Sequence, residues 1–178
     1  MIATGSPWST AAALSALTPL ADGNVAYTFH FYTPMIFTHQ AADWTAPSYG
    51  SVRNLVFPAD TSNVAAVSRD ADPRLAGILV SYLVAFRDTD LMVHEMDVAA
   101  GWARKYDTTV IVTEFGVYNR GVPASSRAGW LGAVRAQLEK ENMGWTVWEY
   151  KGSYGIDDDL RRGCTGASAA KVLDLCSP

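Results

Sequence analysis

The sequence predicts an α/β fold in which four parallel strands alternate with helices. Short runs of β-branched and aromatic residues recur along the chain, and segments with helical spacing of apolar residues lie between them. The chain has 178 residues, of which 49% are hydrophobic, so it is long enough for one domain with a buried core. One run, Thr109 to Glu114, ends in a single carboxylate. A buried strand that presents one acid at its carboxyl end is typical of an α/β barrel.

The first part of the chain is expected to contain two strands, a helix and a long loop. Ile2–Thr4 reads as the end of a strand, and Ser9–Leu17 as a short helix stopped by Pro19. Val25–Phe31 is the next expected strand. Residues 32 to about 71 are rich in Pro, Ser, Asn and aromatic residues without clean periodicity, which predicts a long loop with small embedded pieces. Loops of this length in compact domains are usually functional or mobile.

The second part of the chain repeats the strand and helix alternation. A helix is expected to begin at Asp72-Pro73, because an acid can cap it and proline suits its first position. The remaining expected elements, in order, are a helix over 89–105, the strand ending at Glu114, a helix over 125–141, a strand over 144–150, a polar loop through Arg162 and a helix over 167–175. Such alternation implies parallel strands joined by right-handed crossovers.

Composition and charge exclude several classes of partner. The net charge is -4, the pI is near 5.2, and the longest basic cluster is Arg161-Arg162, so nucleic acid is not an expected ligand. No segment approaches the roughly 20 apolar residues of a membrane span. Residues Met1–Gly5 have neither a basic flank nor a long apolar region, so a signal peptide is not expected there.

Metal-binding residues form no recognisable site in the sequence. The three histidines lie on separate expected elements without the spacing of a zinc-ligand pair: His30, His39 and His94. Asp157–Asp159 lack the spacing of an EF-hand loop and read as a solvated acidic loop. We therefore expect no metal and no cofactor.

The two cysteines leave two interpretations open. Cys164 and Cys176 lie twelve residues apart near the C-terminus. Such a pair forms a disulfide in an oxidising compartment or remains as two buried thiols. The spacing alone does not decide between them.

Four segments near expected strand ends carry a resemblance to a known family. They are Tyr27–Tyr32, Pro34–Ala41, Thr113–Gly116 and Gly144–Tyr150. The first, with its His-x-Tyr, resembles the sixth strand of glycoside hydrolase family 5, the retaining cellulases. The third resembles the seventh strand, which bears the nucleophile, and the fourth resembles the eighth strand with its sugar-stacking Trp. The second resembles a loop of a bacterial branch of the family.

The resemblance covers essentially the whole chain but only the second half of the family pattern. It implies half of a TIM (β/α)8 barrel, with four parallel strands that correspond to strands five to eight, in a single half-barrel domain over residues 1–178. It also implies roles for the matching residues. The catalytic residues are Glu114 as nucleophile with His30 and Tyr32 as its polar supports, and the substrate-binding residues are Trp148 and, more weakly, Trp8.

A second carboxylic acid is missing from this reading. A retaining glycosidase needs a nucleophile and an acid/base about 5 to 5.5 Å apart. In the family the acid/base follows an Asn on the fourth strand, and the chain contains no such segment. Strand alternation is expected to send Glu149 and Trp148 to opposite faces, whereas Glu95, Glu139 and Glu141 lie on expected helices, away from strand ends.

Each site residue also has a purely structural interpretation. A glutamate at a strand end can be a solvated loop acid, His30 can be hydrogen-bonded into the core, and Trp148 can be a core residue. Trp102 and Trp130 fall on apolar helix stripes and are expected to pack in the core.

The resemblance implies the C-terminal part of a retaining endo-β-1,4-glucanase, with β-1,4-glucan as substrate and secretion as in most of the family. An open half barrel exposes strand edges, so we expect a homodimer or a pairing with a complementing N-terminal half barrel. Two alternatives remain. One is a catalytically inactive half-barrel fragment with residual glucan binding, and the other is a purely structural fragment.

Overall fold

A single parallel sheet organises the chain, and the computed structural model describes it over residues 1–176. The strands are β1 (Ile2–Thr4), β2 (Ala26–Phe31), β3 (Val110–Phe115) and β4 (Gly144–Trp145). Their order in the sheet, β1-β2-β3-β4, is their order in the chain, and every pair is parallel. Successive βα units of a barrel have this arrangement. The predicted α/β fold with four parallel strands is confirmed.

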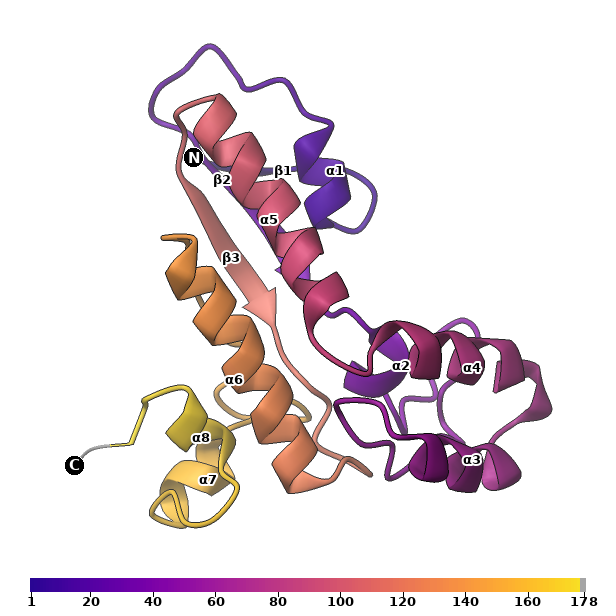
Figure 1. The fold of residues 1–178 in the computed structure, drawn as a ribbon. Coiled ribbons are helices and arrows are strands. Elements are labelled where there is room, and N and C mark those ends of the chain that lie inside the picture. The colour runs from indigo at the N-terminus through magenta and orange to yellow at the C-terminus, as the bar shows by residue number, and fades with distance from the viewer. Residues whose placement is uncertain (177–178) are drawn as a thin grey trace.

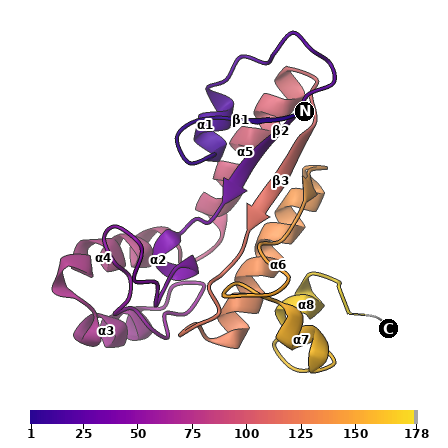
Figure 2. The same ribbon diagram turned by 180° about the vertical axis from the view of Figure 1, so that it is seen from behind.

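The helices that directly precede β2, β3 and β4 pack on one side of the sheet. α1 (Ala11–Ser15) connects β1 to β2, α5 (Asp90–Lys105) precedes β3, and α6 (Ala124–Lys140) precedes β4. In Figure 1 α5 and α6 lie in front of the strands, and in Figure 2, from behind, the strands lie in front of them. The sheet therefore has an outer face, covered by helices, and an inner face that no helix covers within residues 1–176.

The connection from β2 to α5 and the C-terminal segment hold the remaining helices. The first contains α2 (Met35–Thr38), α3 (Thr61–Asp70), the 3-10 helix η1 (Pro73–Leu75) and α4 (Ala76–Ala85), and the second contains α7 (Asp157–Arg161) and α8 (Ala169–Val172). α3 and α4 project beyond the carboxyl ends of the strands (Figure 1). The long connection thus builds a separate lobe at the end of the sheet where barrel sites lie.

Aromatic residues fill the space between the outer face and the helices. Tyr27 and Phe31 alternate with polar residues along β2 and point toward α5 and α6. The Tyr27 ring meets the Trp102 ring edge-on at 5.0 Å, and the Phe31 ring stacks on the Trp130 ring at 6.1 Å. Trp102 and Trp130 are 5% and 0% exposed. The prediction that both tryptophans pack in the core is confirmed.

A row of threonines crosses the inner face of the sheet. The Thr4 hydroxyl donates to the Thr28 carbonyl (2.9 Å), and the hydroxyls of Thr28 and Thr113 lie 2.7 Å apart. The Thr146 hydroxyl donates to the Thr113 carbonyl (2.7 Å). The inner face therefore carries a row of hydrogen-bonded hydroxyls, whereas the outer face is aromatic.

Several predicted bounds are wrong. The last strand pairs only over Gly144–Trp145 rather than 144–150, because β4 is an edge strand whose continuation keeps just scattered bonds to β3, such as Trp148 N to Phe115 O (2.8 Å). The terminal helix is limited to Ala169–Val172. α3 and α7 lie where loops were expected. α3 is short and largely polar, with Val64 and Val67 as its buried residues, and the Asp60 side chain caps it.

The cysteine question is answered by the structure, because Cys164 and Cys176 form a disulfide. Among the described residues no helix is long and apolar enough to cross a membrane. Within the same part of the chain, no group of three or more His, Cys, Asp or Glu side chains is arranged to hold a metal ion.

Candidate active site

A register shift between β2 and β3 turns Glu114 toward the inner face. Phe29 pairs with Val112, but the next residue of β2, His30, pairs with Glu114, so Thr113 is an extra residue in β3. Thr113 and Glu114 therefore both point to the inner face, although they are consecutive. Strict alternation from the buried Val112 would have sent Glu114 to the outer face. A β-bulge of this kind re-aims a side chain next to a site.

Tyr32 and His30 both contact the Glu114 carboxylate. The Tyr32 hydroxyl donates to Oε2 at 3.2 Å, and His30 Nδ1 lies 3.4 Å from the same oxygen. Among the described residues no hydrogen bond to Oε1 is formed. One carboxylate oxygen is thus held by the protein while the other remains available to a ligand. The structure brings the three predicted catalytic residues together.

The Tyr32 hydroxyl is a permanent hydrogen-bond donor. Burial raises the pKa of Tyr32 well above its usual value of 10, and the negative charge of Glu114 and the hydrogen bond to it raise this pKa further. The hydroxyl therefore stays protonated over the whole working range of an enzyme. A fixed donor at Oε2 fixes the orientation of the Glu114 carboxylate.

His39 lies beside Tyr32 and is held in one tautomer. The Thr38 hydroxyl donates its only hydrogen to the Tyr32 carbonyl (2.7 Å), so its contact with His39 Nδ1 (2.9 Å) requires Nδ1 to be the donor. Burial lowers the pKa of His39 from 6.5 to about 4, so the ring is neutral near pH 7. Nε2 is then an unprotonated acceptor on a ring that lines the cavity described below.

An aromatic cluster supports these residues from the side of the β4 loop. The Tyr154 ring packs edge-on against Tyr32 (6.1 Å) and His39 (5.6 Å), and it also contacts Tyr118 (5.5 Å). The Trp44 ring meets Tyr118 edge-on at 4.8 Å. Sequence reasoning did not single out His39, Trp44 or Tyr154 for the site. Pro34–Ala41, which resembled a family loop, was the one signal near His39.

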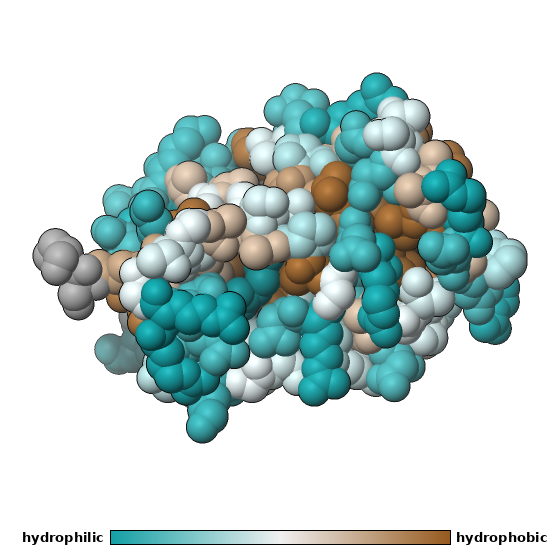
Figure 3. Space-filling model, turned by 90° about the horizontal axis from the view of Figure 1, so that it is seen from below, coloured by the Kyte–Doolittle hydropathy of each residue, from teal (hydrophilic) through white to brown (hydrophobic). Residues whose placement is uncertain are grey.

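A cavity of about 980 Å³ opens at the carboxyl ends of the strands and includes the Glu114 cluster. Viewed from that end, hydrophobic residues gather in the middle of the molecule and hydrophilic ones surround them (Figure 3). The residues that line the cavity are Trp8, Thr10, Ala11, Ala12, His30, Phe31, Tyr32, Thr33, Met35, His39, Trp44, Thr45, Ala46, Tyr49, His94, Glu95, Val98 and Glu114. Its size is that of a small-molecule site.

The tryptophans differ in their relation to this cavity. Trp8 and Trp44 line it and are 89% and 57% exposed, so their rings are free to stack on a ligand. Trp148, in the segment that follows β4, does not line the cavity and is 45% exposed. The peptide bond between Trp148 and Glu149 is cis.

One expectation about the other acids is wrong. Glu95 is on a helix, as expected, but it lies near the strand ends and lines the cavity. The reason is that α5 runs antiparallel to the strands, so its first turns stand beside the end of β2. The Thr33 hydroxyl donates to Glu95 Oε2 (2.8 Å). The Glu149 Oε1 atom accepts from Tyr154 N (3.3 Å). Both acids therefore already have protein donors.

The fold and the site together define half of a (β/α)8 barrel with a hydrogen-bonded carboxylate at the carboxyl end of its third strand. The family model described as cellulase (glycosyl hydrolase family 5) matches residues 1–153. The chain belongs to this family. The resemblance inferred from the strand-end motifs is confirmed.

Curated relatives agree with this assignment. Endoglucanase 3 of Fibrobacter succinogenes is 29% identical over 154 residues, which are 84% of this chain and 23% of that protein. Endoglucanase C of Acetivibrio thermocellus is 25% identical over 138 residues, 78% of this chain and 39% of that protein.

Two solved structures share the fold. The cellulose synthase subunit Z of Clostridioides difficile has a TM-score of 0.68 at 22% identity and covers 97% of this chain, which spans 47% of that chain. Cel5A of Thermotoga maritima, solved with cellobiose, has a TM-score of 0.68 at 24% identity, with 97% and 46% covered. The chain thus spans less than half the length of these proteins, and the half-barrel prediction is confirmed.

Proposed function

We propose that this chain is the C-terminal part of a retaining endo-β-1,4-glucanase and acts as a single half-barrel domain. The observation that supports it is the Glu114 carboxylate, whose Oε2 is held by Tyr32 and His30 inside a cavity of about 980 Å³. Membership of the cellulase family and two endoglucanase relatives support β-1,4-glucan as the substrate.

Glu114 is the nucleophile in this proposal. Its free oxygen, Oε1, attacks the anomeric carbon, and a covalent glycosyl-enzyme forms. The bond from that carbon to the glycosidic oxygen breaks, and this oxygen takes a proton from a second acid and leaves as a sugar hydroxyl. Tyr32 and His30 orient the attacking carboxylate. Trp8 and Trp148 offer faces on which sugar rings stack, and His39 Nε2 accepts a hydrogen bond from a sugar hydroxyl.

The acid/base glutamate is absent from this chain in our proposal. Glu95, which lines the cavity, and Glu149, whose charge acts on Tyr32, already accept hydrogen bonds from Thr33 and from the Tyr154 amide. We therefore propose that a second acid comes from a complementing N-terminal half barrel or a second copy in a homodimer. The uncovered inner face and the two edge strands are the surfaces that such a partner would meet.

We also propose secretion as the location. The Cys164–Cys176 disulfide supports it, because disulfides persist in oxidising compartments. Polymeric glucan is an extracellular substrate, so the two inferences agree.

An activated substrate tests the nucleophile separately from the missing acid. The leaving group of 2,4-dinitrophenyl β-cellobioside departs as a stable anion without protonation, so its displacement needs only the nucleophile. Hydrolysis of the resulting intermediate needs the absent base. We expect a burst of about one dinitrophenolate per chain, an adduct on Glu114 by mass spectrometry, and little turnover of cellulose.

Glu114→Gln is the matched control, since glutamine has the same shape and cannot form the ester. It is expected to abolish the burst and to retain cellotetraose binding. A wild-type chain that binds cellotetraose but gives no burst contradicts the nucleophile role. That result favours the second candidate function, a half barrel that binds glucan without catalysis. The hydrogen bonds that Glu95 and Glu149 already accept from the protein support this candidate. Absence of both binding and burst indicates a structural fragment.

Light scattering tests the partner. We expect the isolated chain to form a dimer or to associate further. A monodisperse 19.2 kDa species with a cooperative unfolding transition contradicts the pairing proposal.

A further inference from the structure

A buried arginine on α6 binds the two loops that flank the Glu114 cluster. Arg127 is 8% exposed, and its guanidinium donates to the backbone carbonyls of Val117 (3.3 Å), Tyr154 (2.9 Å) and Gly155 (2.8 Å). Its NH1 lies 3.5 Å from Asp159 Oδ2. A buried cation is costly unless its donors and charge are matched. The planar fork of arginine can hold several acceptors at fixed positions, which an ammonium group cannot.

The three carbonyls belong to the loops that follow β3 and β4. Val117 is three residues beyond Glu114, and Tyr154 is in the loop after β4. The same loops are joined by Asn119, whose amide donates to the Ser153 carbonyl (2.8 Å) and whose side chain donates to the Gly152 carbonyl (3.1 Å). Arg127 therefore joins the loop that follows Glu114 to the loop that contains Tyr154.

The Arg127 contacts reach the site by two routes. One route is along the backbone from Val117 to Glu114. The other passes through the Tyr154 ring, which packs against Tyr32 and His39, while Tyr32 donates to Glu114. Displacement of either loop would move the donor or the acceptor of the Tyr32–Glu114 hydrogen bond.

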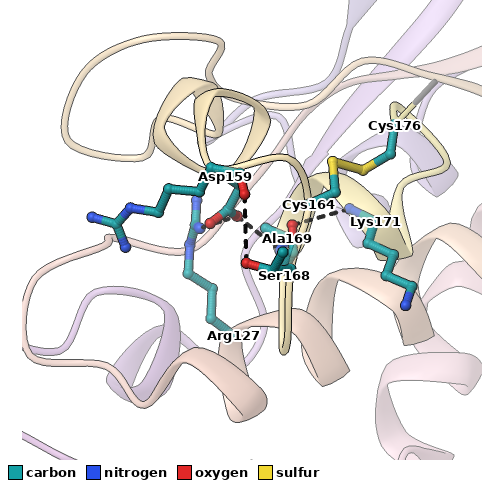
Figure 4. Close-up of a disulfide and its surroundings, with 9 residues drawn as sticks. Arg127, Asp159, Cys164, Ser168, Ala169, Lys171 and Cys176 are labelled. Atoms are coloured by element: carbon teal, nitrogen blue, oxygen red, sulfur yellow. Dashed lines mark hydrogen bonds and ion pairs between the residues drawn. A yellow bond between two sulfur atoms is a disulfide. The ribbon is translucent and has the colours of Figure 1, made fainter.

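The C-terminal segment holds the counter-charge in place. Asp159 Oδ2 also accepts from the amide of Ala169 (2.8 Å), the first residue of α8. Figure 4 shows Arg127 and Asp159 facing each other beside Ser168 and Ala169, with the Cys164–Cys176 disulfide on the far side of α8. Tyr154 and Asp159 lie beyond residues 1–153, the part that the family model matches.

We propose that Arg127 is a positioning residue that fixes the Glu114 cluster by holding the Val117, Tyr154 and Gly155 carbonyls, with Asp159 as its counter-ion. Its link to catalysis rests on the proposed role of Glu114 as nucleophile. The geometric part, that Arg127 sets how Tyr154 packs on Tyr32 and His39, does not depend on that role.

The test compares Arg127→Met with Arg135→Met in the full chain. Arg135 lies two turns further along α6 and bonds Glu139 Oε1 (2.8 Å) and the Val172 carbonyl (3.2 Å), so it reaches the C-terminal segment but not the site loops. Arg127→Lys is the second variant, because it keeps the charge beside Asp159 and loses the fork. All measurements are made well below each variant's melting temperature.

The first readout is the imidazole NMR titration of His39, which requires no catalysis. In wild type and Arg135→Met the midpoint is expected near pH 4. In Arg127→Met, and to a smaller degree in Arg127→Lys, it is expected to rise by about one unit or more, since a displaced Tyr154 exposes the ring to water. An unchanged midpoint in folded Arg127→Met and Arg127→Lys overturns the proposal.

The second readout is the burst rate with 2,4-dinitrophenyl β-cellobioside. We expect a fall of about tenfold or more in Arg127→Met, an intermediate fall in Arg127→Lys, and less than a twofold change in Arg135→Met. Burst rates equal to those of Arg135→Met overturn the link to catalysis. Absence of a burst in wild type refutes the proposed function instead, and the His39 titration still decides the geometric part.

Discussion

The two faces of the sheet differ in what they contribute. The outer face carries Tyr27, Phe29, Phe31 and Phe115, all buried under the helices, whereas the inner face carries threonines, His30 and Glu114. Burial of aromatic surface supplies free energy of folding without directional chemistry. Polar groups supply direction and charge at little net gain in stability. The outer face therefore supplies stability and the inner face supplies the chemical groups. Substitutions on the two faces should have different consequences.

The largest expected effect is on the outer face, at Trp130. Trp130→Ala removes a fully buried ring that packs on Phe31 and Phe115 and donates to the Thr33 carbonyl (3.0 Å). We expect a loss of about 3–5 kcal/mol in the free energy of unfolding, measured by urea denaturation. The exposed Trp8 is the control, and its replacement by Ala should change stability by less than about 0.5 kcal/mol. Similar losses in both variants would contradict the assignment of stability to the outer face.

The second-largest expected effect is a dependence of folding stability on pH. It arises at His39, next to the Glu114 cluster of the inner face. Its folded pKa is about 4, below the usual 6.5, so between these values the unfolded chain binds more protons than the folded one. Stability therefore falls as the pH drops through this window and is unaffected by His39 above it. At pH 5 the loss is about 2 kcal/mol.

His39→Gln removes this titration while other groups continue to titrate. Urea unfolding at pH 7 and pH 5 should show wild type losing about 2 kcal/mol more than His39→Gln between the two conditions. Equal losses in the two proteins would mean that the folded ring takes up its proton near pH 6.5.

A smaller effect is expected from the threonine row. Thr113→Val removes the hydroxyl that lies 2.7 Å from the hydroxyl of the buried Thr28. We expect a loss of about 1 kcal/mol in the free energy of unfolding. Thr165→Val is the control, because its exposed hydroxyl has only a 3.5 Å contact with the Arg162 carbonyl and should contribute almost nothing. A loss as large as that of Trp130→Ala would show that the inner face is also a main source of stability.

The smallest effect is expected at Glu95, the second acid of the cavity. Glu95→Gln keeps an oxygen that accepts from the Thr33 hydroxyl, so stability should change by less than about 0.5 kcal/mol. The burst rate with the activated cellobioside should change less than twofold, in contrast to its loss in Glu114→Gln. Any cellulose hydrolysis that disappears in Glu95→Gln would identify Glu95 as the missing acid.

Sequence reasoning reached the residues whose signals are local. Glu114, His30 and Tyr32 stand at the ends of strands with clear β-branched or aromatic patterns, and the structure brings them together. His39 and Trp44 come from the long connection after β2, which has no periodicity. That connection is ordered by tertiary contacts, such as the buried Gln40 side chain that bonds the Leu55 amide and carbonyl.

The burial of Arg127 and its contacts with the two loops could also not be predicted from the sequence. It lies on a helix that has apolar residues nearby, and an arginine in such a position normally faces solvent. Its burial depends on three carbonyls and a carboxylate that the chain brings together from 10 to 32 positions away. No local pattern reports such a set of partners.

The sequence by itself determined the order of strands and helices along the chain and the carboxylate at the end of the third strand, because strand propensity and helix caps act over a few residues. Only the tertiary structure decided which face of the sheet Glu114 occupies. Alternation along β3 alone would have placed Glu114 on the outer face. The register of β3 against β2 leaves Thr113 as an extra residue, so Glu114 lies on the inner face instead. Register is a property of two paired strands, and the partners here are about 80 residues apart, with His30 opposite Glu114.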